Sequence, residues 1–237
     1  MEYDILLCIS QGDDVASLKR IIMNRKVDGV ILLRTFVNDP QVEFLIEKDI
    51  PFVAAGSSEY EKVKQVDHDH ETACKELTSI ILMRGLKNIA ILGGNESFVV
   101  NQTRLRGVRD AYEQFGIKLE PGSLFMNLES KPFIEKAVDD ALAQEAECIL
   151  CMDDAICSQV LRKLRQDHVK IPDDVRIASF YNSSVLENNI PSITSLSFDA
   201  KELGMTACKN LLSQVDGEEV PDKVLLSYEV VLKESTK

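Results

Sequence analysis

Residues 73–93 read ACKELTSIILMRGLKNIAILG and place a helical pattern directly before a buried strand. From Ala73 to Arg84 the side chains of one face recur at i, i+4, i+7, i+8 and i+11, which is typical of a helix that packs on a core. After Gly85 the pattern changes to the mainly apolar run Asn88–Leu92. Such a run indicates a strand buried on both faces of a parallel sheet. A helix that leads at once into this kind of strand predicts an α/β fold.

The same alternation extends over the whole chain. Helical periods recur around Ile156–Leu164 and Leu203–Leu212. The strand candidates are Tyr3–Ile9, Gly29–Leu33, Phe52–Ala55, Asn88–Leu92, Ser123–Asn127, Cys148–Cys151, Val175–Phe180 and Val224–Leu232. We therefore predict the α/β class with doubly wound parallel sheets. Both halves read as strand–helix series with a break near residues 93–96, which predicts two lobes that close a cleft around a small ligand.

The composition excludes several classes of protein. The 237 residues include 27 Lys+Arg and 39 Asp+Glu, a formal net charge of −12. No general field draws such a chain onto nucleic acid, so any DNA-binding part lies outside it. No apolar run approaches the ~18–20 residues of a membrane helix, and the first residues lack the pattern of a secretory signal. The six cysteines read as reduced thiols, which predicts a cytoplasmic protein.

No motif for catalysis, a cofactor or a metal is strong. Cys148 and Cys151 have the spacing of a redox pair, but their place within a strand favours core packing. The stretch Asp67–His70 looks like a metal cluster, yet on an extended segment its histidines share one face and its aspartates the other. Gly93 and Gly94 are not followed by the spacing of a dinucleotide loop, and no nucleophile elbow or triad can be assembled. We therefore predict no enzyme, no cofactor and no metal site.

Polar residues follow most of the strand candidates. In doubly wound sheets a ligand binds beyond the carboxyl ends of the strands. The residues at those ends are Ser10-Gln11, Arg34-Thr35, Gly56-Ser57, Gly94-Asn95, Asn127, Asp153-Asp154 and Tyr181-Asn182. This set suits a polar small molecule that is neutral or weakly charged.

Two positions have competing interpretations. Arg104 begins a helix after the break between the lobes, where a guanidinium could fork onto ligand hydroxyls or a carboxylate. The alternative for Arg104 is a solvated helix residue. Asp153 and Asp154 precede another helix, so one of them is expected to cap it. The other could face the cleft.

Several stretches together resemble the effector-binding core of the lactose/galactose-repressor family of bacterial transcription regulators. They occur in the family's order and cover essentially the whole chain. The stretches are Val27–Leu33, Pro51–Gly56, Val66–His70, Ala73–Gly93, Arg104–Gly107, Asp153-Asp154, Ile171–Phe180, Pro191–Leu196 and Phe198–Ala207. Each stretch is weak by itself, whereas the whole series is specific.

The resemblance implies a periplasmic-binding-protein-like fold of type I with two lobes, 1–94 plus 196–221 and 95–195 plus 222–237. It implies a regulator, most often a repressor, that forms a homodimer and binds a small polar effector in the cleft. The effector would be a sugar, a nucleoside or a similar compound. Operator DNA would be contacted only through a headpiece that is not present in this chain, and no membrane is involved. The alternative is a solute-binding receptor of the same fold.

The resemblance also implies a set of effector-binding residues. Arg104 resembles the family's effector-clamping arginine, and Asp153 stands where the family has a ligand-binding Asn or Asp. Thr72 lies near another pocket position, and Phe198 resembles the cleft residue after the last crossover. The other expected members are Tyr181, Asn182, Arg34 and Asn101.

The chain departs from the family pattern in two places. Tyr181 stands where the family often has an aspartate that binds sugar hydroxyls, and Asn182 could partly compensate. The first strand and helix of the first lobe also have no counterpart, because Tyr3–Ile9 matches the second strand. We therefore expect a truncated chain, or a lobe that rearranges around the gap.

Overall fold

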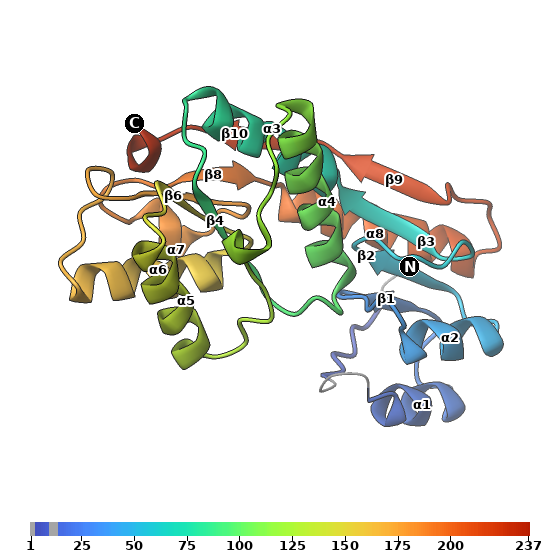
Figure 1. The fold of residues 1–237 in the computed structure, drawn as a ribbon. Coiled ribbons are helices and arrows are strands. Elements are labelled where there is room, and N and C mark those ends of the chain that lie inside the picture. The colour runs from blue at the N-terminus through green and yellow to red at the C-terminus, as the bar shows by residue number, and fades with distance from the viewer. Residues whose placement is uncertain (1–2, 10–13) are drawn as a thin grey trace. The chain divides into compact units, whose positions relative to one another are not determined.

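The computed structural model describes residues 3–9 and 14–237. The chain forms two compact units (Figure 1). The first unit holds Met1–His68, Ser97–Val99 and Ala200–Leu226. The second unit holds Asp69–Glu96, Val100–Asp199 and Ser227–Lys237.

The first unit is built on one parallel sheet in the order β1-β2-β3-β9. The strands are β1 Val30–Leu32, β2 Phe52–Ala55, β3 Lys64–His68 and β9 Lys223–Leu226. The helices are α1 Ala16–Met23, α2 Pro40–Glu47 and α8 Ala200–Val215. Side chains alternate across β2, so that Phe52 and Ala54 pack with α1 and α2 while Val53 and Ala55 pack with α8. Helices therefore cover both faces of this sheet.

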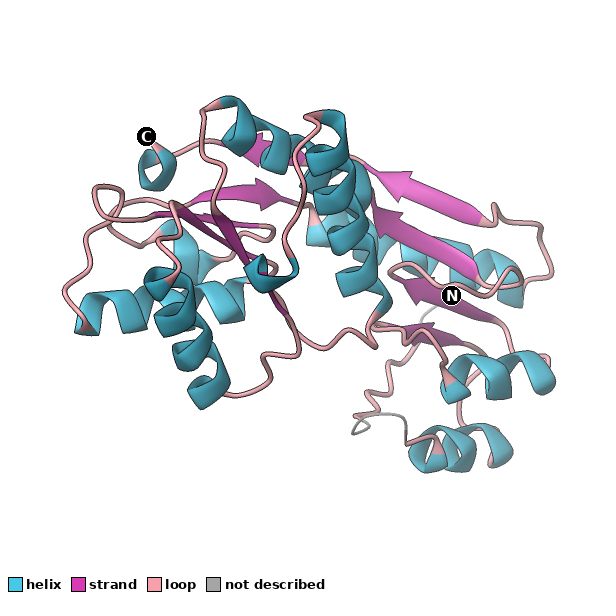
Figure 2. Ribbon diagram, viewed as in Figure 1, coloured by secondary structure: helices cyan, strands magenta, loops and turns pink. Residues whose placement is uncertain are grey.

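The second unit is built on a six-stranded sheet in the order β10-β8-β7-β6-β4-β5. Its strands are β4 Ile89–Leu92, β5 Leu124–Phe125, β6 Cys148–Cys151, β7 Arg176–Ser179, β8 Thr194–Ser197 and β10 Glu229–Val231. Only the pairing of β10 with β8 is antiparallel in the described sheet. Figure 2 shows its strands in magenta between cyan helices.

Two hydrophobic clusters cover the two faces of this second sheet. The helices and short 3-10 turns of the unit are α3 His70–Met83, α4 Val99–Gln114 (apart from its first residue), η1 Pro121–Ser123, α5 Lys131–Ala143, α6 Asp154–Gln166, α7 Ser184–Glu187 and η2 Glu234–Thr236. Cys148 and Leu150 of β6 pack with α3 and α4, while Ile149 and Cys151 pack with α5 and α6. The predicted α/β class with doubly wound parallel sheets is confirmed, because helices lie on both faces of each sheet.

Two of the predicted strands differ from the strands of the structure. Tyr3–Ile9 was predicted as a strand, but these residues belong to none, and the side chain of Ile5 is 95% exposed. A strand needs the backbone groups of a neighbour, and in the part of the chain that the structure describes β1 pairs only with β2. The predicted strand Val224–Leu232 is two strands, since β9 pairs in the first unit and β10 in the second.

The units also divide the chain elsewhere than the predicted lobes, which were 1–94 with 196–221 and 95–195 with 222–237. The segment Asp69–Leu92 lies in the second unit. Its helix α3 packs in the same hydrophobic cluster as Ile89 and Ile91 of β4, and β4 pairs with β6. Residues 222–226 lie in the first unit, because β9 pairs with β3. Sheet pairing and not the sequence break therefore sets these boundaries.

Candidate functional site

The order of strands in the second unit creates a switch point between β4 and β6. The strand that follows β4 in the chain, β5, pairs on one side of β4, whereas β6 pairs on the other side. Crevices at the carboxyl ends of strands beside such a reversal are the usual ligand sites of doubly wound sheets. Gly93 and Gly94 follow β4, and Asp153 follows β6 after a single residue.

Asn101 and Asp153 both lie close to Gly94. A Cβ atom built on Gly94 would lie 3.3 Å from Asn101 Nδ2 and 3.8 Å from Asp153 Oδ2. Asn101 is only 4% exposed, and its Nδ2 donates to the carbonyl oxygen of Asn95 at 2.8 Å. The small residue after β4 therefore lets two polar side chains from different segments approach one spot.

Asp153 has two roles in this arrangement. Its Oδ1 accepts a hydrogen bond of 2.8 Å from the backbone N–H of Ile156, so Asp153 is the N-cap of α6. Its other oxygen, Oδ2, is the one that lies near Gly94. Asp154 is the first residue of α6, and its backbone oxygen accepts from Ser158 Oγ. The same aspartate thus caps the helix and presents an oxygen at the end of β4.

Arg104 is buried on α4, with 7% of its surface exposed. This excludes the alternative of a solvated helix residue. Its Nε is inaccessible and has no hydrogen bond among the described residues, and no carboxylate there pairs with its guanidinium. Burial raises the pKa of the nearby Cys74 thiol above its ordinary range, while the charge of Arg104 acts in the opposite direction. Buried polar atoms without a hydrogen bond are rare in folded proteins, so the Nε of Arg104 is a candidate donor for a ligand.

An aromatic group lies at the ends of β7 and β8. The ring of Phe198 stacks with Tyr181 at a centroid distance of 6.0 Å and an interplanar angle of 23°. His70 packs against the same ring at 4.5 Å with a 59° tilt. His70 was not predicted for the site, because the polar stretch around it reads equally well as a strand end. The sequence marked His70 only as part of the metal-like stretch Asp67–His70, and its contact with Phe198 depends on the fold.

Asn182 and Thr72, also expected in the site, differ in burial. Asn182 Nδ2 donates to Glu187 Oε1 at 3.1 Å, whereas its Oδ1 and the neighbouring Ser183 Oγ are buried without a hydrogen-bond partner in the described structure. Thr72 is exposed in the first turn of α3, where its N–H donates to Asp69 Oδ1 at 3.1 Å. Buried oxygens without partners are rare, so the end of β7 provides hydrogen-bonding capacity for a ligand.

The first unit has polar strand ends of its own. Arg34 follows β1, and its guanidinium lies 4.5 Å from the centre of the Phe98 ring. The Thr35 hydroxyl donates to the backbone oxygen of Ser57 after β2. Ser57 Oγ in turn donates to Asp67 Oδ2 of β3 at 2.8 Å, and Asp67 Oδ1 accepts from the N–H of His68 at 2.8 Å. Asp67 therefore orders the strand ends, which is a structural role for part of the stretch that looks like a metal cluster.

The structure thus brings together two pairs of the predicted residues within the second unit, Asn101 with Asp153 and Tyr181 with Phe198. Arg34 lies in the first unit. The gathered groups are donors, acceptors and rings, which bind by hydrogen bonds and stacking.

The cysteines at 148 and 151 are fully buried in the core as predicted, and burial raises the pKa of Cys148 to about 12. No helix in the described residues is both long and apolar enough to span a membrane.

Several known proteins are similar to this chain in sequence and fold. A family model described as a periplasmic binding protein-like domain matches residues 80–236. Catabolite control protein A of Staphylococcus xylosus is 24% identical over 235 residues, which are 97% of this chain and 71% of that protein. The crystal structure of a transcriptional regulator LacI from Bacillus cereus is 27% identical and superposes with a TM-score of 0.87 over 92% of this chain and 79% of that chain. The transcriptional regulator CelR in complex with cellobiose is 25% identical, with a TM-score of 0.84 over 92% and 68%.

Proposed function

The chain belongs to the periplasmic binding protein-like domain family and is the effector-binding core of a LacI-family transcriptional regulator, and we propose that Arg104 and its neighbours bind the effector. The observation that carries the proposal is the buried Nε of Arg104, which has no hydrogen-bond partner among the described residues. A ligand that supplies acceptor oxygens would satisfy it. Charge-assisted hydrogen bonds of this kind are among the stronger ones in proteins.

The proposed effector is a small polar molecule such as a sugar or a nucleoside. Asp153 Oδ2 and Asn182 Oδ1 are acceptors for ligand hydroxyls, and the rings of Tyr181 and Phe198 offer an apolar face. A sugar has both kinds of surface, since its hydroxyls lie around a ring with apolar C–H faces. The structure of CelR with cellobiose supports this class of ligand, because that regulator binds a disaccharide.

We further propose that Arg34, which follows β1 in the first unit, is another donor for the effector. The resemblance of the chain to two-lobed regulators supports this. Binding that differs between two conformations would then shift the population between them. The parent protein would act as a homodimer in the cytoplasm and reach its operator through a DNA-binding headpiece outside this chain.

The test compares Arg104→Gln with Arg106→Gln, which is two residues further along the same helix and pairs at the surface with Glu71. A thermal-shift screen of mono- and disaccharides, nucleosides and amino-acid derivatives on the unchanged chain first identifies a ligand. A ligand at 100 times its Kd should stabilise the chain by about 2.7 kcal/mol. Arg104→Gln should lose this stabilisation, whereas Arg106→Gln should keep it. Equal affinity of both variants for the ligand would exclude Arg104 from the site.

A further inference from the structure

A cavity of about 260 Å³ lies at the amino ends of the strands of the second unit, away from the residues assigned to the effector. It is lined by Arg84, Leu86, Arg176, Thr236 and Lys237. Leu86 precedes β4 and Arg176 is the first residue of β7, whereas Gly94 and Tyr181 follow the same two strands. The cavity and the candidate effector site therefore lie at opposite ends of one sheet.

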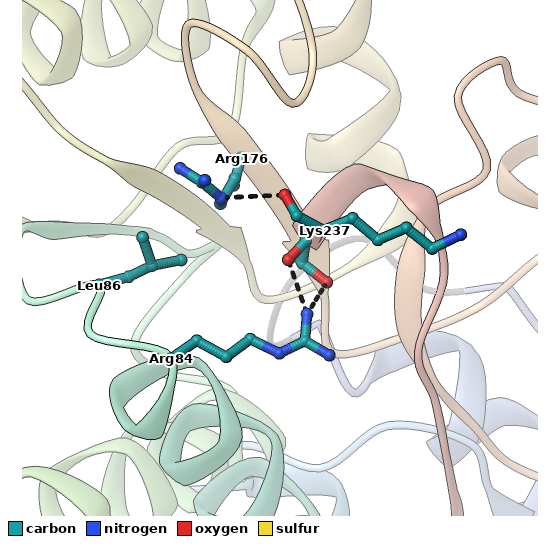
Figure 3. Close-up of a pocket in the computed structure, with 5 residues that line it drawn as sticks. Arg84, Leu86, Arg176 and Lys237 are labelled. Carbon is teal, nitrogen blue, oxygen red and sulfur yellow. Dashed lines mark hydrogen bonds between the residues drawn. The ribbon is translucent and has the colours of Figure 1, made fainter.

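The two arginines of this cavity are held in place by the main chain of the last residues. Arg84 Nη1 donates to the carbonyl oxygen of Thr236 at 2.6 Å and to its Oγ1 at 3.0 Å. Arg176 Nε donates to the backbone oxygen of Lys237 at 3.3 Å. Figure 3 shows Arg84 and Arg176 on opposite sides of the last residues, with dashed lines from both guanidiniums to the oxygens of that segment and with the side chain of Lys237 directed away from them.

The segment that anchors the arginines is itself fixed on the sheet. Ser235 Oγ donates to the carbonyl oxygen of Ile177 at 2.6 Å, and the hydroxyls of Thr236 and Thr194 lie 2.7 Å apart. Ser235 and Thr236 are almost completely buried. The wall that orients both guanidiniums is therefore part of the folded core.

Both guanidiniums keep donors to spare. In the described part of the chain, Nε and Nη2 of Arg84 and both Nη atoms of Arg176 make no hydrogen bond, and neither arginine forms an ion pair. The chain as a whole has 39 Asp+Glu against 27 Lys+Arg. Two guanidiniums beside one cavity, with no acidic side chain in its lining, are thus a local concentration of positive charge on an acidic protein.

One carboxylate lies close to this cationic group. The pKa of Glu147 is lowered, first by hydrogen bonds from the backbone N–H groups of Asn88 and Lys87 and to a smaller degree by the charge of Arg176. Its Oε2 accepts both backbone bonds, at 2.8 and 3.0 Å. Glu147 is therefore committed to the turn before β4, and the spare donors of Arg176 remain available.

We propose that this cavity binds a phosphate group, either as the free ion or on a small metabolite. A phosphate has acceptor oxygens on all sides, so it can accept from guanidiniums on opposite walls, whereas a planar carboxylate matches a single fork. Pockets for drug-sized ligands occupy about 300–1,000 Å³. A cavity of about 260 Å³ accordingly suits one phosphate with a short organic part, and Leu86 is an apolar residue of its lining that could contact that part.

Isothermal titration of the chain with inorganic phosphate tests the proposal, with sodium chloride at matched ionic strength as the reference. Arg84→Gln and Arg176→Gln should each weaken phosphate binding roughly tenfold or more, because a hydrogen bond to a charged group is lost. Arg109→Gln removes an equal charge from the exposed face of α4 and should leave the affinity unchanged. Glu147→Gln should tighten binding by removing a nearby negative charge.

Equal phosphate affinity in Arg176→Gln and the unchanged chain would overturn the proposal, and so would heats that chloride reproduces at the same ionic strength. Arg176→Gln gives up only one long hydrogen bond to the main chain, so it keeps the test valid if Arg84→Gln does not fold. Glycerol phosphate and glycerol, titrated side by side, distinguish a bound metabolite from the free ion. Tighter binding of glycerol phosphate than of inorganic phosphate would place the organic part on Leu86.

Discussion

Gly107 holds helices α3 and α4 in close contact, and an alanine at this position should destabilise the second unit. A Cβ atom on Gly107 would lie 2.3 Å from the backbone oxygen of Glu71 and 3.0 Å from both the Cβ of Cys74 and the backbone nitrogen of Lys75. These atoms belong mainly to the backbone of α3, which cannot move aside as a side chain can. To reach even 3.0 Å the helices would have to separate by about 0.7 Å in a close-packed core.

The magnitude follows from two opposing effects. Replacing glycine by alanine inside a helix stabilises it by about 1 kcal/mol. Overpacking a core costs about 1–3 kcal/mol, and the backbone contact at Gly107 points to the upper part of that range. We expect Gly107→Ala to lower the free energy of unfolding by about 2 kcal/mol in sum.

Gly204→Ala is the matched control, because Gly204 lies inside α8 and a Cβ there would meet nothing within 4 Å. This variant should gain up to about 1 kcal/mol. Calorimetry and urea unfolding followed by circular dichroism measure both variants, and calorimetry separates the transitions if the two units unfold independently. A Gly107→Ala protein as stable as the unchanged chain would refute the close contact between α3 and α4.

Two further outcomes follow from burial. Burial raises the pKa of Tyr112 from 10.0 to about 12; the folded state therefore holds this proton more tightly, and the stability it contributes is complete below pH 10 and is lost as the pH rises toward 12. Tyr112→Phe should flatten the decline of the urea midpoint over this alkaline range, and parallel curves for the two proteins would contradict the assignment. A thiol reagent should modify the exposed Cys8 and Cys208 quickly and the buried cysteines only on unfolding, as mass spectrometry can follow; the buried cysteines are Cys74, Cys148, Cys151 and Cys157. Labelling of Cys148 at the rate of Cys208 would show that β6 is not buried as described.

Strands that are apolar along their whole length could be predicted from the sequence. Phe52–Ala55 and Cys148–Cys151 begin and end where their composition predicts, because all of their residues are buried and so no polar position interrupts the pattern. Strands β3 and β8 were not among the strands predicted from the sequence. Gln65, Thr194 and Ser195 are buried in them, and their burial depends on the neighbouring strands.

Tyr3–Ile9 shows the opposite case. Its composition is that of a strand, yet its residues are exposed and belong to no strand. Local propensity cannot supply the second backbone that a strand needs. Composition therefore indicates where strands can form, and the availability of a partner decides whether they do.

The α/β class, the alternation of helices and strands and the polar character of the strand ends follow from the amino-acid sequence alone, because they depend on periods and compositions within short segments. The burial of Arg104 Nε without a hydrogen-bond partner and the approach of Asn101 and Asp153 to Gly94 became visible only in the folded chain. The same holds for the packing of His70 on Phe198. These contacts join residues that lie far apart in the chain, and their geometry depends on sheet order and helix packing, which no single segment encodes.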